Sequence, residues 1–146
     1  EGLVGGRGDG LVFMADDGPA CRELWISDGT EARTQLLLDL NPGLRGSFPY
    51  ALTVIGDTLF FAADDGSAGF ELWRSDGTPS GTVPIVDIRQ GSLRSDPFWL
   101  TPAGDSLYFV SSNATHGRAM WVSAGTFVRT PRIQDLVPRP SATPHL

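Results

Sequence analysis

The chain has 146 residues, 40% of them hydrophobic, and a formal net charge of −6. This length suits one domain with a single core, and without a basic stripe nucleic acid is not expected as a partner. Because 18 glycines and 11 prolines separate aromatic and β-branched blocks, the composition fits an all-β domain rich in turns.

Cysteine content and the length of apolar runs exclude further classes of protein. Cys21 is the single cysteine, which excludes an intrachain disulfide and a cysteine-based metal site. No apolar run approaches the roughly 18 residues that span a bilayer, so membrane insertion is not expected. The chain begins at Glu1 without a methionine or a signal peptide, and we expect it to be a processed or excised segment of something longer.

One motif recurs along the chain at a constant spacing. Residues 23–30 read ELWISDGT, residues 71–78 read ELWRSDGT, and residues 119–126 read AMWVSAGT, so that their tryptophans stand 48 residues apart. A fixed period of this size is typical of repeat architectures. The sequence therefore predicts a single repeat domain, 1–146, of three units: 1–48, 49–96 and 97–144.

Turn residues divide the middle unit into predicted strands. The strands are expected at 50–55, 59–63, 70–75 and 83–88, and Gly and Asp-Gly turns separate several of them. Such short connections indicate an antiparallel meander of four strands. The longer link at 89–97 would carry the chain from one sheet to the next.

Two closed folds use repeated four-stranded units: the β-propeller, which arranges them as blades, and the β-trefoil, which joins three units in one barrel. The second strands form continuous apolar runs at 11–15, 59–63 and 107–110, which is typical of strands covered on both faces and favours blades. Three blades do not close a ring. We therefore expect half of a six-bladed ring or a segment of a larger propeller, completed by self-association through blade faces or by further blades of a longer chain.

The repeated motif also carries a resemblance. The ELW and SDGT segments of residues 71–78, preceded by Ala-Asp-Asp-Gly at 63–66, resemble the bacterial proteins named for an ELWxxDGT repeat, and more loosely TolB-like β-propeller blades. The third unit departs from this pattern at Ala119, Met120 and Ala124. The resemblance implies a propeller in secreted or cell-surface proteins of bacteria, and it implies no reaction.

The motif residues are expected to be structural. Trp25, Trp73 and Trp121 are predicted to form the repeat core, with ligand stacking as the alternative. Glu23 and Glu71 come two residues before a tryptophan and lie on the same side of the strand as that tryptophan. If buried, each carboxylate would need hydrogen-bond donors from a neighbouring blade or from an adjacent arginine, Arg22 or Arg74. Catalytic residues are usually unique in a chain, so these recurring carboxylates do not indicate an enzyme.

Metal and cofactor sites are not expected. Adjacent carboxylates at Asp16-Asp17 and Asp64-Asp65 could bind calcium, but turn bonding explains them equally well. The histidines, His116 and His145, lack any metal-ligand spacing.

If the units are blades, the loops between second and third strands share one rim with the links between blades. We expect any glycan, peptide or protein ligand to bind there, on Arg45, Phe48, Tyr50, Asp64, Asp65, Arg94, Asp96, Phe98, Trp99, His116 and Arg118. The sequence thus predicts a non-enzymatic binding or scaffold module. The alternative is a carbohydrate-binding lectin, as an oligomeric propeller or a trefoil.

Overall fold

A computed structural model describes residues 3–5, 10–16, 18, 21–43, 45–86, 88, 94–113, 117–125 and 130–135. These residues are all-β apart from one short 3-10 turn, η1 (Glu31–Arg33). None of the helical structure in this part of the chain is long and apolar enough to cross a membrane.

The described strands form three four-stranded antiparallel sheets, each with its strands in chain order. The first sheet contains β1 (Leu3–Gly5), β2 (Leu11–Asp16), β3 (Arg22–Ser27) and β4 (Gln35–Leu38). The second contains β5 (Tyr50–Ile55), β6 (Thr58–Asp64), β7 (Phe70–Ser75) and β8 (Val83–Val86). The third contains β9 (Phe98–Ala103), β10 (Ser106–Asn113), β11 (Gly117–Ser123) and β12 (Arg132–Asp135).

The predicted strands of the middle unit are close to the observed ones. The bounds of β5 and β7 match the prediction, and β6 is one residue longer at each end. The prediction was wrong at the end of the fourth strand, because β8 ends at Val86 rather than at residue 88. The Ile88 N–H donates to the Glu71 carboxylate instead of continuing the ladder.

Equivalent strands pair in the same register. Trp25 lies opposite Phe13, Trp73 opposite Phe61, and Trp121 opposite Phe109. The pairing of each third and fourth strand shifts just before the tryptophan, at Leu24/Trp25, Leu72/Trp73 and Met120/Trp121. The tryptophan therefore occupies the same irregular position in all three sheets.

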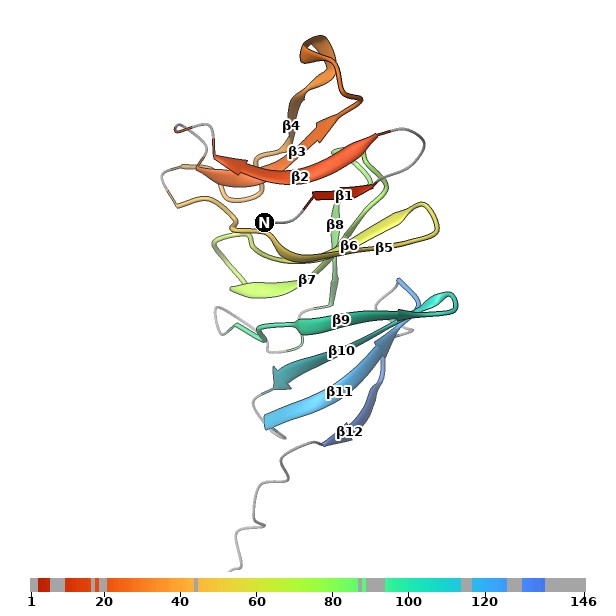
Figure 1. Ribbon diagram of the computed structural model, residues 1–146. Helices are drawn as coiled ribbons and strands as arrows, with labels where there is room; N and C mark the ends of the chain where they lie inside the picture. Colours follow the sequence, from red (N-terminus) through yellow and green to blue (C-terminus); the bar gives the residue numbers. More distant parts are fainter. Residues whose placement is uncertain are drawn as a thin grey trace, which may run out of the picture.

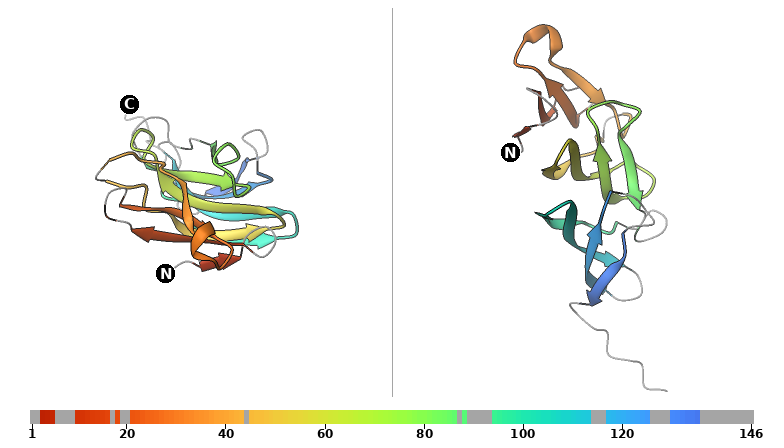
Figure 2. Two further views of the ribbon diagram at one scale, coloured as in Figure 1. Left: turned by 90° about the horizontal axis from the view of Figure 1, so that it is seen from above. Right: turned by 90° about the vertical axis from the view of Figure 1, so that its right-hand side faces the viewer.

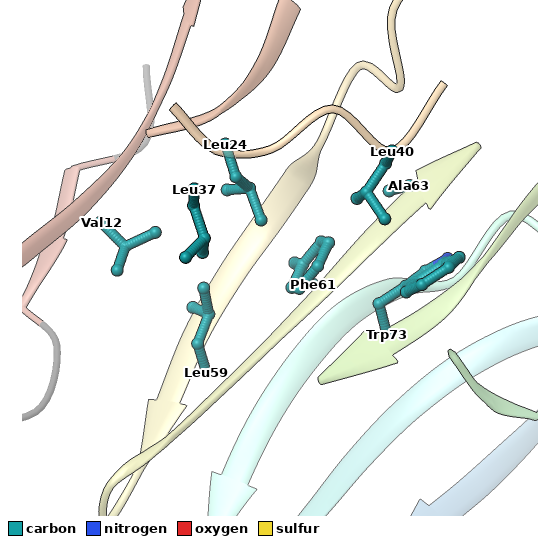
Figure 3. Close-up of a cluster of buried hydrophobic side chains, with 8 residues drawn as sticks. All are labelled: Val12, Leu24, Leu37, Leu40, Leu59, Phe61, Ala63 and Trp73. Carbon is teal, nitrogen blue, oxygen red and sulfur yellow. The ribbon is translucent and has the colours of Figure 1, made fainter. Parts of the chain in front are cut away.

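The three sheets stack face to face in chain order (Figure 1). Their first strands lie along one side of the stack, where β5 contacts both β1 and β9, and their fourth strands lie on the opposite side (Figure 2, right). One apolar cluster fills the space between the first and second sheets (Figure 3), and another joins the second to the third. The middle sheet is thus covered on both faces, and all of Leu59 to Ala63 in β6 is buried.

Candidate functional site

The glutamate of the ELW motif lies in a buried hydrogen-bonded junction at the end of the first sheet. Glu23 is fully buried, and its carboxylate accepts hydrogen bonds from Leu40 N at 3.2 Å and Ser47 N at 2.6 Å. The Ser47 hydroxyl donates a further short hydrogen bond to the same carboxylate. We call the contact of Glu23 with Ser47, and the equivalent contact of Glu71 with Ser95, the Glu–Ser junction.

The second junction repeats the first with an offset of 48 residues. Glu71, 2% exposed, accepts from Ile88 N at 3.1 Å, from Ser95 N at 3.1 Å and from Ser95 Oγ at 2.6 Å. The expected donors were a neighbouring blade or an adjacent arginine. These donors come instead from the link that leaves the glutamate's own sheet.

Each junction serine also contacts the following sheet. The Ser47 carbonyl accepts a hydrogen bond from Asp64 N at 3.0 Å, and the Ser95 carbonyl accepts from Ser112 N at 2.9 Å. The Ser111 hydroxyl donates to the same Ser95 carbonyl at 2.9 Å. A buried carboxylate is therefore coupled, through one serine, to the second strand of the next sheet, which is a structural arrangement.

Burial determines the protonation behaviour of Glu23. Loss of hydration raises its pKa above the ordinary value of 4.5, although the hydrogen bonds from Ser47 and Leu40 act in the opposite direction. The third sheet has buried Ala119 at the equivalent position and so has no such carboxylate.

The junction serines were not identified in the sequence analysis. A signal was present, since Ser47-Phe48-Pro49 and Ser95-Asp96-Pro97 share a Ser-x-Pro pattern at the 48-residue offset. Both serines and both prolines are buried.

The repeated tryptophans lie beside phenylalanine rings. Trp73 is 6% exposed, and its ring stacks on Phe61 with centroids 6.5 Å apart. Trp121 stacks on Phe109 at 6.5 Å but is only partly buried, as is Trp25. The three indole nitrogens have no hydrogen-bond partner within the described ranges, and ring packing positions Trp73 and Trp121.

The acidic loops form turns. Asp64 Oδ1 accepts from Gly66 N at 2.8 Å, and Asp65 Oδ1 accepts from Ser67 N, Ser67 Oγ and Ala68 N at 2.8 to 2.9 Å. Burial opposes ionisation of Asp65, but these hydrogen bonds outweigh it and lower its pKa. Asp16 Oδ1 accepts from Gly18 N at 2.9 Å, and Asp17 lies outside the described residues.

Three predicted rim residues and the neighbouring Phe70 form a cluster of two aromatic rings, an arginine and an aspartate. It lies where the link between the second and third sheets contacts the middle sheet. The Tyr50 and Phe70 rings are 5.5 Å apart, and the Arg94 guanidinium lies 5.6 Å from the Phe70 centroid. Arg94 Nε also lies 4.0 Å from Asp96 Oδ1. Burial, with the nearby Asp96 charge, raises the pKa of Tyr50 and keeps its phenol protonated. We call Tyr50, Phe70, Arg94 and Asp96 the rim cluster.

Similar cation–aromatic contacts occur in the other two sheets. Arg22 lies 5.8 Å from the Phe48 centroid, and Arg118 lies 5.2 Å from the Phe98 centroid. The acidic loop of the middle sheet is close to both links, because a Cβ on Gly66 would meet Asn41 Oδ1 at 2.7 Å and one on Gly69 would meet Arg94 N at 2.9 Å. The structure thus places this loop and the links together, on one rim of the stacked sheets.

The remaining predicted rim residues are scattered. Arg45 is exposed, and Trp99 is 73% exposed and lies on the open face of the third sheet, with Tyr108 and Met120 around the same hollow. His116 lies outside the described residues. Phe70 completes the rim cluster but was not among the predicted residues.

Comparisons with known proteins add no assignment: no protein-family model, curated protein or solved structure matches this chain. Within the described residues, no three His, Cys, Asp or Glu side chains are grouped so that they could hold a metal ion.

Proposed function

We propose that the chain is a non-enzymatic β-propeller segment that serves as a binding or scaffold module in a secreted or cell-surface bacterial protein. The observation that carries the proposal is the middle sheet, which is buried on both faces by equivalent four-stranded sheets. Propeller blades pack in this way. The location is supported only by the ELWxxDGT resemblance of the repeated motif.

The pairing of the strands favours blades over a trefoil. A trefoil joins strands of all three units in one barrel, whereas each described strand pairs only with strands of its own sheet. The side-by-side arrangement of β1, β5 and β9 agrees with blades, whose first strands surround the propeller axis.

A structural role for the repeated acidic groups supports the non-enzymatic assignment. Glu23 and Glu71 hold the links, and Asp64 and Asp65 hold turns. Glycoside hydrolysis needs two carboxylates facing one cleft, whereas these carboxylate oxygens accept hydrogen bonds from their own chain.

Hydrogen–deuterium exchange at a concentration where light scattering shows a monomer tests the stacked arrangement. We expect β6 and β7 to exchange most slowly, because both faces of their sheet are covered, and the strands of the outer sheets to exchange faster. Equal protection of the three units would contradict stacked blades and favour a single barrel.

The lectin alternative is supported by the rim cluster, because aromatic rings beside Arg94 and Asp96 offer stacking and hydrogen bonding to a sugar. A glycan array probed with labelled protein tests it. Binding that is lost in Arg94→Ala and kept in the exposed-site control Arg33→Ala would support a lectin. No signal on the array would leave the scaffold function as the proposal.

A further inference from the structure

Each sheet has two faces, which the contacts within the chain distinguish. The forward face, toward the next sheet in the chain, carries Val12, Leu24 and Leu37 in the first sheet and Phe60, Leu72 and Ile85 in the second. The backward face, toward the preceding sheet, carries Leu59, Phe61 and Trp73 in the second sheet and Leu107, Phe109 and Trp121 in the third. Forward faces therefore pack on backward faces at both internal contacts.

The forward face of the third sheet is open. Its equivalent residues, at the 48-residue offset, are Tyr108, Met120 and Ile133, with exposed fractions of 38%, 37% and 49%. The corresponding residues of the two covered forward faces are all 5% exposed or less. Beside them, Trp99, Tyr108, Val110 and Met120 line a hollow of about 460 Å³. This face has the apolar character of an internal contact, but none of the three sheets in the described part of the chain covers it.

The backward face of the first sheet is the open counterpart. Its residues, Leu11, Phe13 and Trp25, are partly exposed. Their equivalents Leu59, Phe61 and Trp73 are 0 to 6% exposed because the first sheet covers them. The two ends of the stack thus present the two halves of a contact that the chain already makes twice.

We propose that the open forward face of the third sheet binds the open backward face of the first sheet in a second copy of this chain. This inference rests on the proposed blade arrangement. In a two-fold closed pair each copy uses both faces, so both contacts are equivalent and six sheets complete a ring. A stable interface buries about 800 Å² per partner, and a buried aromatic side chain contributes about 150 to 250 Å². Each copy of the closed pair makes two contacts, so each contact needs about half of this area. Trp99, Tyr108 and Met120 contribute to it with the side-chain area that they leave exposed.

Light scattering after size-exclusion chromatography of the full chain tests the pair. We expect a mass about twice 15.6 kDa for the wild-type chain and a monomer for Met120→Glu and for Phe13→Glu, since each charge falls in both contacts of the ring. Ile133→Glu and Leu11→Glu are second variants of the same two faces, and circular dichroism confirms that each variant is folded. Ala32→Glu is the matched control. Its equivalent in the second unit, Ser80, is exposed although the first sheet covers that sheet, so position 32 should stay exposed when a second copy binds.

Mixing the two monomeric variants tests the direction of the contact. The Met120→Glu copy retains an intact backward face and the Phe13→Glu copy an intact forward face, so an equimolar mixture should form a one-to-one complex through one unmodified contact. A dimer that Phe13→Glu leaves intact would show pairing of two forward faces and overturn the proposal. Open-ended oligomers would overturn the closed pair. A wild-type chain that stays monomeric at every soluble concentration would overturn the proposal that a second copy covers this face. If hydrogen–deuterium exchange then still showed a protected middle sheet, the blade arrangement would stand without the pair.

Discussion

Glu23 and Ser47 lie 24 residues apart in sequence, yet the carboxylate accepts hydrogen bonds from both the amide and the hydroxyl of the serine. Because the Ser47 carbonyl also accepts from Asp64 N, the pair connects the third strand of one sheet to the second strand of the next. The ELW glutamate is thus a tertiary contact residue that fixes how consecutive sheets are joined.

Removing the Glu23 carboxylate should destabilise the chain strongly. Glu23→Ala leaves Leu40 N, Ser47 N and Ser47 Oγ without their acceptor in a buried site. At about 1 to 3 kcal/mol for each unsatisfied group, partly offset by relaxation, we expect a loss of about 3 kcal/mol in the free energy of unfolding. Urea denaturation measures this loss.

Exposed Glu31 in η1 provides the control, because Glu31→Ala should change the free energy of unfolding by no more than about 0.5 kcal/mol. A double-mutant cycle with Ser47→Ala should show a coupling of about 1 kcal/mol or more, since the two residues are in contact. Equal losses for Glu23→Ala and Glu31→Ala would refute the structural role of the junction.

Much of the fold could be predicted from the sequence because its determinants are local. The Gly56-Asp57 and Asp76-Gly77 turns set the ends of β5 and β7, and the apolar run 59–63 lies within β6. The end of β8 could not be predicted, because Ile88 leaves the ladder for Glu71, which lies 17 residues earlier. The partners of the glutamates were missed for the same reason, since hydrophobic periodicity carries no information on polar contacts between distant segments.

The position of Trp99 shows a second limit. Its place near the start of the first strand of its unit suggested the rim, and its ring does lie 4.9 Å from that of Phe98. However, Trp99 has a positive φ of 55°, and its side chain borders the open face with Tyr108 and Met120. Ala51, the equivalent residue in the second sheet, has the same φ of 55°. A backbone conformation of this kind in a non-glycine residue is not apparent from residue type.

The titration of Glu23 should make stability depend on pH. Because burial raises its folded-state pKa above 4.5, the folded chain holds this proton more tightly than the unfolded chain. The contribution of Glu23 is therefore fully present below pH 4.5 and is lost as the pH rises through the folded-state pKa. Glu23→Gln removes this titration, so we expect the stability of the wild-type chain relative to the variant to fall as the pH rises above 4.5.

Guanidinium denaturation of the wild-type chain and of Glu23→Gln, at pH values from about 4 to about 8, gives the free energy of unfolding of each protein as a function of pH. Glu31→Gln, at an exposed residue of η1, is the matched control for the Glu-to-Gln change. A wild-type advantage that grows with pH would show that the hydrogen bonds from Ser47 and Leu40 outweigh burial.

Truncation of Trp73 should cost more than truncation of Trp25. Trp73 is 6% exposed between two sheets, whereas Trp25 is partly exposed on the open backward face. We expect Trp73→Ala to lower the free energy of unfolding by about 3 to 5 kcal/mol, and Trp25→Ala to lower it by less in dilute, monomeric protein. Trp73→Phe keeps an aromatic ring beside Phe61 and should cost less than Trp73→Ala, because it removes less buried volume and the indole nitrogen has no partner among the described residues. A loss below about 1 kcal/mol for Trp73→Ala would contradict a core role and favour ligand stacking.

The hydroxyl pair that closes each third-to-fourth-strand hairpin should contribute to stability. Ser75 Oγ and Thr82 Oγ1 are 2.7 Å apart and buried, and the same contact joins Ser27 to Thr34 at 2.7 Å and Ser123 to Thr130 at 2.9 Å. Thr82 Oγ1 donates to the Thr78 carbonyl and Ser75 Oγ accepts from Gly77 N, so the Ser75 hydroxyl donates to Thr82. Thr82→Val removes both side-chain hydrogen bonds of Thr82 while keeping its shape, and we expect a loss of about 1 to 3 kcal/mol in thermal or urea unfolding. Thr82→Ser keeps the hydroxyl and should retain most of this stability; equal losses for the two variants would show that the methyl group, rather than the hydroxyl pair, stabilises the hairpin.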